Sequence, residues 1–234
     1  MEKELKSEGK CIFCNQTFSQ KEIGKHLTLH LLKMEKDDVV KGPEKFCHIV
    51  VESGVMFLQL LVRGNCTMKK IDRFLQDIWL DCCGHLSNFG HQDYKIKVSH
   101  KVSDVFETRV KIYHDYDYGD TTRIFLKGIK NYTLKLKEDI VLLSRNEPLK
   151  LICAKCEKQP AANICTVCDW NFYCEGCSVK HEEECEDFND YAKMPVVNSP
   201  RMGICGYTGG HIDIERDGVY KVNKVKIITT KGSN

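Results

Sequence analysis

Residues 153–185 read CAKCEKQPAANICTVCDWNFYCEGCSVKHEEEC, a stretch in which seven cysteines and one histidine fall into four pairs. Gaps of eight, five and three residues separate the pairs, which are Cys153/Cys156, Cys165/Cys168, Cys174/Cys177 and His181/Cys185. Two cysteines in a Cys-x2-Cys turn can hold one cation, and residues at i and i+4 share one face of a helical turn. We therefore expect the four pairs to form two tetrahedral zinc sites.

The order of the pairs favours a cross-brace, in which alternate pairs share an ion. One set would then be Cys153, Cys156, Cys174 and Cys177, and the other Cys165, Cys168, His181 and Cys185. Sequential pairing stays open, because spacing does not fix connectivity. Four Cys/His ligands leave no open position, so the pattern predicts structural zinc. The stretch resembles a B-box or MYND-type module, with Cys185 where the closest kind of B-box has histidine.

A second motif near the N-terminus supplies four more candidate ligands, Cys11, Cys14, His26 and His30. It resembles a C2H2 zinc finger, with eleven residues between its pairs in place of the usual twelve. Phe18 and Ile23 take the apolar positions of a finger core, and Ser19 is placed to cap the helix. Lys21 and Lys25 are then candidate nucleic-acid contacts. A single finger reads only about three base pairs, so a protein-contact or purely structural finger is an equal alternative.

Composition sets limits on the class of protein. The 234 residues are 42% hydrophobic and 29% charged, which is typical of one globular core with small satellites. The formal net charge is only +2, so no polybasic phosphate-binding segment is expected. The fourteen cysteines, together with an N-terminus that has no apolar signal region, favour a reducing cytoplasm and no membrane segment. Twelve ligands predict about three zinc ions per chain.

The middle of the chain predicts an α+β fold. Apolar β-rich runs at 46–51 and 55–62 flank a turn, and apolar residues from 71 to 79 recur at helical spacing. Further strands are expected at 94–99, 110–112, 122–127, 132–136 and 140–143. We therefore expect a mostly antiparallel sheet with one main covering helix, plus small zinc-stapled modules. The expected domains are a finger at 1–32, a linker at 33–45, the α+β domain at 46–149, the double-zinc module at 150–188, and a loop with a short hairpin at 189–234.

A family resemblance spans residues 46 to about 210. Its motifs are Trp79, His85-Leu86, Phe89, residues 116–122 (YDYGDTT), residues 143–148 (LSRNEP) and residues 195–209 (PVVNSPRMGICGYTG). Together they resemble the plasmid ORF-3-like family, also described as the TnpR passenger protein of an insertion element. Thr122 and Ile124 stand where that family commonly has tryptophan and histidine. The resemblance implies an association with mobile elements, and the chain has no serine constellation for resolvase chemistry.

Other candidate sites are weaker. Asp115, Asp117 and Asp120, with His85 or His114, suggest a metal-dependent enzyme acting on nucleic acid, although Asp and Gly between strands are ordinary turn residues. Arg201 and Tyr207 lie in a glycine-rich loop that could bind an anion. We do not expect a site at Cys82, Cys83, His85 and His91, since adjacent cysteines tend to point apart. The favoured function is a zinc-binding interaction protein whose partner is a nucleic acid or protein, with no assigned oligomeric state; the alternative is that enzyme.

Overall fold

A computed structural model describes residues 5–37, 44–106 and 110–217. Its contacts divide these residues into two compact units. The sheet unit holds residues 5–75 and 86–147, and the cysteine-rich unit holds residues 76–85 and 148–217. The second unit therefore combines a short segment from the middle of the chain with its C-terminal third.

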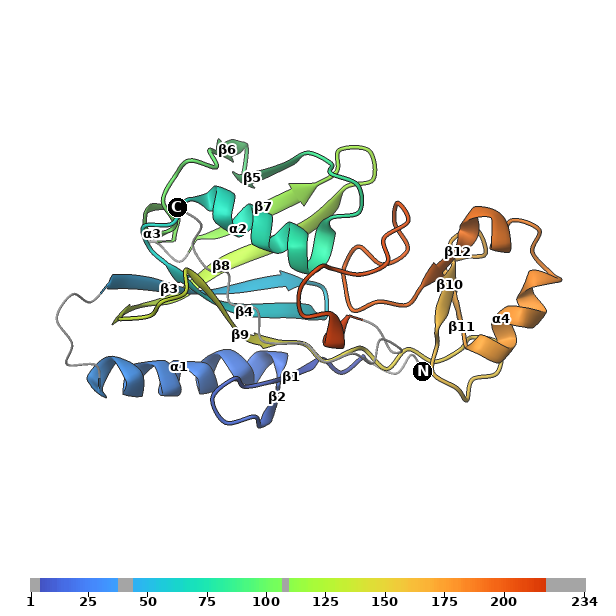
Figure 1. Ribbon diagram of the computed structural model, residues 1–234, viewed down its shortest axis with the longest axis horizontal. Coiled ribbons are helices and arrows are strands. Elements are labelled where there is room, and N and C mark those ends of the chain that lie inside the picture. Colours follow the sequence, from blue (N-terminus) through green and yellow to red (C-terminus); the bar gives the residue numbers. More distant parts are fainter. Residues whose placement is uncertain (1–4, 38–43, 107–109, 218–234) are drawn as a thin grey trace. The chain divides into compact units, whose positions relative to one another are not determined.

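The sheet unit contains a seven-stranded antiparallel sheet in the order β6-β5-β7-β8-β3-β4-β9 (Figure 1). Its strands are β3 (Glu44–Ser53), β4 (Met56–Arg63), β5 (Ser87–His91), β6 (Tyr94–Ile96), β7 (Lys111–Tyr116), β8 (Thr122–Leu134) and β9 (Ile140–Arg145). The predicted α+β class with a mostly antiparallel sheet is confirmed. Sequence reasoning missed β5 and divided β8 into two strands, because a bulge opposite His48 and Ile49 interrupts its alternation.

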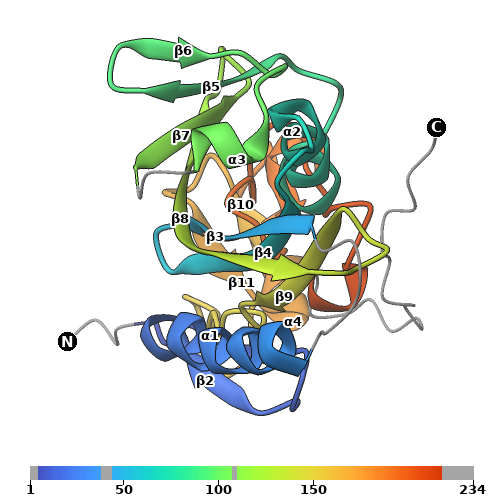
Figure 2. The ribbon, with the colours of Figure 1, turned by 90° about the vertical axis from the view of Figure 1, so that its left-hand side faces the viewer.

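Helices lie on both faces of this sheet (Figures 1 and 2). On one face α2 (Met68–Leu75) buries Ile71, Phe74 and Leu75 of the stripe expected from helical spacing, together with Met68, and α3 (Val102–Val105) is a single short turn. The last two residues of the expected stripe, Ile78 and Trp79, lie in the next element, η1 (Gln76–Leu80). On the other face lies α1 (Gln20–Asp37), the helix of the predicted finger. The finger is completed by the hairpin of β1 (Glu8–Lys10) and β2 (Thr17–Ser19).

The residues of the predicted finger belong to the sheet unit. Ile23, Leu27 and Leu31 are fully buried on α1, in a cluster with side chains of the sheet that include Phe46, Phe57, Leu61, Tyr132, Leu134 and Leu143. The hairpin reaches β9 as well, since Ile12 N–H donates to the Leu143 carbonyl (3.0 Å) and Gly9 bridges to Asn146. The structure thus differs from the expected boundary after residue 32, because α1 continues to Asp37 and its apolar stripe is covered by the sheet.

The cysteine-rich unit is built from short elements. A three-stranded sheet in the order β11-β10-β12 is accompanied by α4, and irregular loops make up much of the rest. The elements are η1 (Gln76–Leu80), β10 (Asn163–Cys165), β11 (Asn171–Tyr173), α4 (Glu175–Glu182), η2 (Phe188–Ala192), β12 (Lys193–Pro195) and η3 (Ile214–Arg216). Such short elements bury little apolar surface by themselves, so cross-links are needed to hold them.

Two expectations lie outside the described residues: the linker residues 38–43 with Gly42-Pro43, and the closing hairpin beyond residue 217. In the part of the chain that the structure describes, no helix has the length and apolar character required to cross a membrane.

Candidate metal centres

Four sets of cysteine and histidine side chains converge in the structure. Within each set every candidate ligand atom lies within 4.8 Å of the others. The sets are Cys11/Cys14/His26/His30, Cys82/Cys83/His85/Cys205, Cys153/Cys156/Cys174/Cys177 and Cys165/Cys168/His181/Cys185. Each set has four ligands of the types that bind zinc, and each could hold a metal ion.

The double module groups its pairs in alternating order, as the cross-brace requires. Cys156 Sγ lies 3.9 Å from Cys174 Sγ, and Cys168 Sγ lies 3.7 Å from Cys185 Sγ. A tetrahedral zinc with bonds of about 2.3 Å separates two thiolate sulfurs by about 3.8 Å. A disulfide would instead bring them to about 2.05 Å. The spacing therefore suits a shared cation rather than a covalent bond.

Local turns and the ends of α4 orient the ligands of the double-zinc module. Glu157, Asp169 and Trp170 all have positive φ, and they follow the Cys153/Cys156 and Cys165/Cys168 pairs where each loop reverses. Cys174 precedes the first residue of α4, and Cys185 N–H donates to the His181 carbonyl (2.9 Å) at its end. The His181 ring stacks on Tyr173 at 4.2 Å between centroids. His181 Nε2 is buried and has no hydrogen-bond partner. Buried polar atoms normally have one, so a bound metal ion would explain this exception.

The pKa values of the thiols in the double-zinc module also fit a bound cation. Burial opposes ionisation of Cys153, but N–H groups of Cys156, Cys174 and Lys155 directed at its sulfur lower its pKa to about 6. Burial and the neighbouring Cys174 raise the pKa of Cys177 to about 12. Clustered thiols oppose one another's ionisation, and a divalent cation reverses this by binding all of them as thiolates.

The finger motif also converges. Cys14 Sγ and His30 Nε2 lie 3.2 Å and 3.1 Å from His26 Nε2. The positive φ of Asn15 closes the turn after Cys11 and Cys14. Phe18 stacks on the His26 ring at 3.9 Å, and Ser19 Oγ hydrogen-bonds to the Glu22 carboxylate (2.6 Å) in the first turn of α1. The predicted miniature core and helix start are thus in place, although the wider core belongs to the sheet unit.

The set at Cys82, Cys83, His85 and Cys205 corrects the sequence interpretation, which had rejected a site in this segment. The adjacent cysteines do not point apart, since their sulfurs are 3.7 Å from each other. His91 is not among the converging ligands, and its Nδ1 lies 3.1 Å from the Lys111 carbonyl. Sequence reasoning missed Cys205, which lies 120 residues after His85 in a loop without a ligand-spacing pattern.

Two of the three acidic residues proposed for catalysis, Asp115 and Asp117, have local partners, and the third, Asp120, is exposed. Asp115 is buried and accepts two hydrogen bonds from Arg123, at 2.6 and 2.7 Å. Asp117 has φ of 65° and accepts from Gly119 N–H (2.9 Å), which is turn geometry. His114 is bonded to Asp72 Oδ1 at 2.7 Å. Among the described residues these side chains form no group of three or more converging metal ligands.

The Arg201 loop is not an open anion site either. Arg201 and Tyr207 are buried, with exposed fractions of 0% and 1%. The Arg201 guanidinium donates to Cys82 Sγ at 3.6 Å. Gly203 has a positive φ, and a Cβ at this position would approach the Trp170 ring to 2.5 Å. The loop therefore packs within the cysteine-rich unit, and the side chains of Arg201 and Tyr207 lie in its interior rather than on an exposed surface.

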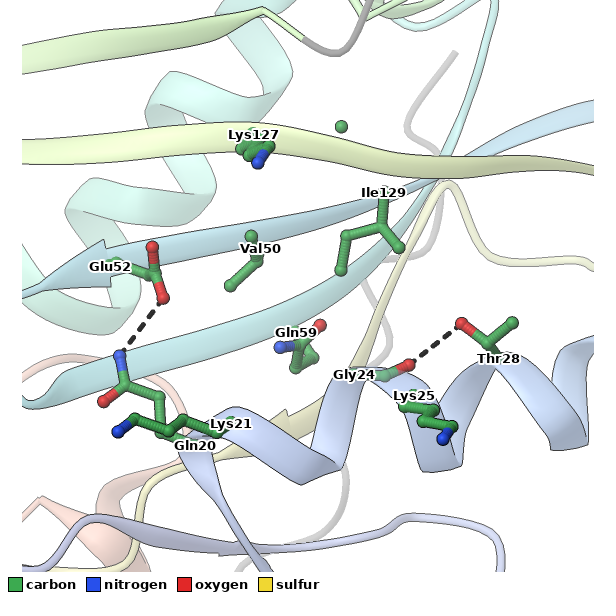
Figure 3. Close-up of a pocket in the computed structure, with 11 residues that line it drawn as sticks. Gln20, Lys21, Gly24, Lys25, Thr28, Val50, Glu52, Gln59, Lys127 and Ile129 are labelled. Carbon is green, nitrogen blue, oxygen red and sulfur yellow. Dashed lines mark hydrogen bonds between the residues drawn. The ribbon is translucent and has the colours of Figure 1, made fainter.

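Lys21 and Lys25 border a pocket between α1 and the sheet (Figure 3). Lys127 of β8 lines the same hollow, together with Val50, Glu52 and Gln59. Gln20 Nε2 donates to Glu52 Oε1 at 3.2 Å. Among the residues that line the hollow, Glu52 is acidic and Lys21, Lys25 and Lys127 are basic. The two candidate contact residues of the finger thus face a hollow that also includes sheet residues.

Comparisons with known proteins add little. Neither the family models nor the curated proteins contain a match to this chain. Among solved structures, a protein of unknown function from Methanosarcina mazei Go1 is 18% identical with a TM-score of 0.35. The likeness covers 39% of this chain and 63% of that one, and it carries no functional information.

Proposed function

We propose that this chain is a zinc-stapled interaction protein that binds nucleic acid through one face of its sheet. Zinc is the proposed metal because thiolate and imidazole ligands in sets of four suit it, and a filled coordination sphere gives a structural role. The same reasoning assigns no reaction to the ion. The function then rests on the surfaces that these cross-links hold in place.

The observation that carries the proposal is a cationic and aromatic surface on β7, β8 and α1. Along β8, Ile124 and Leu126 are buried, while Arg123, Phe125 and Lys127 alternate with them and are exposed. Lys111 Nζ lies 4.1 Å from the centre of the Phe125 ring. We call the residues Lys21, Lys25, Lys111, Arg123, Phe125 and Lys127 the open face.

The chemistry of the open face suits a nucleic-acid strand. Lysines that surround a hollow attract phosphates, and an exposed aromatic ring can stack on a base. Part of the charge of the open face is already neutralised, since Asp115 pairs with Arg123. Binding should therefore be weak and sensitive to salt. The resemblance of residues 46 to about 210 to a family associated with mobile elements supports the same class of partner.

Fluorescence anisotropy with labelled single-stranded and duplex oligonucleotides, at low and high salt, tests this function. The variant Lys25→Glu/Lys127→Glu should bind at least about tenfold more weakly and lower the salt slope by roughly 2 for a duplex, as expected for two lost phosphate contacts. The matched control Lys158→Glu/Lys180→Glu makes the same charge change at exposed positions of the cysteine-rich unit. Equal loss in both variants, or no binding by the wild type at micromolar concentrations, overturns the proposal.

A further inference from the structure

The cysteine-rich unit contains one ligand set outside the two recognisable zinc motifs, and its geometry is that of a metal site. Cys83 Sγ lies 3.7 Å from both Cys82 Sγ and Cys205 Sγ. His85 Nε2 lies 3.0 Å from Cys83 Sγ and 3.3 Å from Cys205 Sγ. The sulfur separations match the value of about 3.8 Å expected around tetrahedral zinc, and they are far from the length of about 2.05 Å in a disulfide.

The first three ligands are held by a tight turn. Asp81 N–H donates to the Gln76 carbonyl (2.9 Å), and this closes the wide helical turn of η1. Gly84 follows with φ of +79°, and its N–H donates to Asp81 Oδ1 (2.8 Å). A glycine at this position allows the chain to reverse, so that Cys82, Cys83 and His85 approach one point.

The fourth ligand comes from a loop that is bound to η1 by contacts independent of any metal. Ser199 Oγ donates to the Trp79 carbonyl (2.6 Å), and His211 N–H donates to the Asp77 carbonyl (2.6 Å). At Gly210 a Cβ would approach the Ile78 carbonyl oxygen to 2.4 Å, so this position requires glycine. Cys205 itself has φ of +50°, a conformation that costs free energy and is kept where the surroundings impose it.

The charge environment also suits a bound ion. Three thiolates and one neutral imidazole around a divalent cation carry a net charge of −1. The guanidinium of Arg201, fully buried, donates to Cys82 Sγ at 3.6 Å and supplies a compensating positive charge. Metal ligands in proteins usually make a hydrogen bond to a group that does not itself bind the metal, and Arg201 has this position relative to Cys82.

We propose that Cys82, Cys83, His85 and Cys205 bind a fourth zinc ion, which cross-links residues 76–85 to the loop at 198–217. The site is structural, because four protein ligands complete a tetrahedron. It is also the most accessible of the four sets, since both Cys83 and Cys205 are exposed. This ion should therefore leave first when a chelator is added. The proposal does not depend on nucleic-acid binding.

Native mass spectrometry on the full chain and its variants tests the site. Wild type should carry four zinc ions and Cys205→Ala three. Cys205→His, which keeps a zinc ligand at this position, should recover the fourth ion. The control Cys66→Ala removes a thiol that belongs to none of the four sets, and it should keep four. Three ions in the wild type, or the same count in wild type and Cys205→Ala, overturns the proposal.

Alkylation of the unmodified protein gives a second test that needs no variant. Exposed thiols react quickly with iodoacetamide, whereas zinc-bound thiolates are protected. Cys83 and Cys205 should be protected in the zinc-loaded chain, and a mild chelator should make them the first cysteines to react. Full-rate labelling of both in protein that carries zinc at its other sets contradicts the site.

Discussion

His48 is fully buried, and its hydrogen-bond partner is the neutral amide of Gln59, whose Oε1 lies 2.8 Å from Nε2. Burial lowers its pKa from 6.5 to about 4, and the Gln59 hydrogen bond offsets this only in part. Between pH 6.5 and pH 4, His48 is protonated in the unfolded chain but stays neutral in the folded chain. The free energy of unfolding should therefore fall as the pH drops from 6.5 to 4, by roughly 3 kcal/mol in total from this one group.

The variant His48→Gln isolates this contribution, because metal loss at low pH affects both proteins alike. The unfolding free energy of the wild type minus that of the variant should fall steadily from pH 7 to pH 4, by roughly 3 kcal/mol. Denaturant titrations at several pH values measure it. A difference that stays constant over this range would show that His48 titrates normally.

Cys174 belongs to one of the two ligand sets of the double-zinc module, so its substitution tests the contribution of a single ligand. Cys174→Ser should release one ion and loosen the cysteine-rich unit, because structural zinc supplies about 10–16 kcal/mol in isolated fingers. The sheet unit has its own core and should keep its melting transition. Zinc analysis with a thermal melt decides, and simultaneous collapse of both units would contradict this division.

The finger helix α1 is the element whose role changes most between sequence and structure. Its metal ligands, miniature core and helix start could be predicted, since they depend on spacing within twenty residues. From the sequence, docking on the sheet through a stripe of Leu27, Leu31 and Leu32 is only an alternative to an independent finger, because a helical stripe does not identify the surface that covers it. In the structure Leu27 and Leu31 are buried together with Ile23, and Leu32 is partly buried. Burying these three side chains contributes roughly 5–9 kcal/mol, which is comparable with the whole stability of a domain.

Deletion of residues 1–40 should therefore expose Phe46, Phe57 and Leu61 and make the remaining chain insoluble or much less stable. A finger that folded independently would leave the melting midpoint unchanged. A thermal melt of the truncated protein distinguishes the two results.

Gly9→Ala tests the same docking by a smaller change. A Cβ at Gly9 would lie 2.7 Å from the Arg145 carbonyl oxygen and from the Phe57 ring, in a position that backbone atoms cannot vacate easily. We expect a loss of about 1–3 kcal/mol in unfolding free energy. The control Gly176→Ala adds a Cβ with nothing within 4 Å, inside α4, and should be neutral or slightly stabilising. Equal effects would mean that the hairpin is not held at β9.

At the scale of the whole molecule, the α+β class and the double module could be predicted because they rest on local alternation and close spacing. The two-unit division could not, since residues 76–85 leave the sheet unit and join a loop more than a hundred positions later. The set at Cys82, Cys83, His85 and Cys205 was missed for the same reason. Contacts between distant segments leave no periodic signal in one sequence.

The central claim is that Cys/His sets hold this chain together through structural zinc. Native mass spectrometry of the intact chain, with a denatured mass as reference, tests it most directly. We expect a folded species heavier by four zinc ions, with all fourteen cysteines free of disulfides. Three ions would rule out only the proposed site at Cys82, Cys83, His85 and Cys205. A folded chain with one zinc ion or none would show that structural zinc does not hold this fold together.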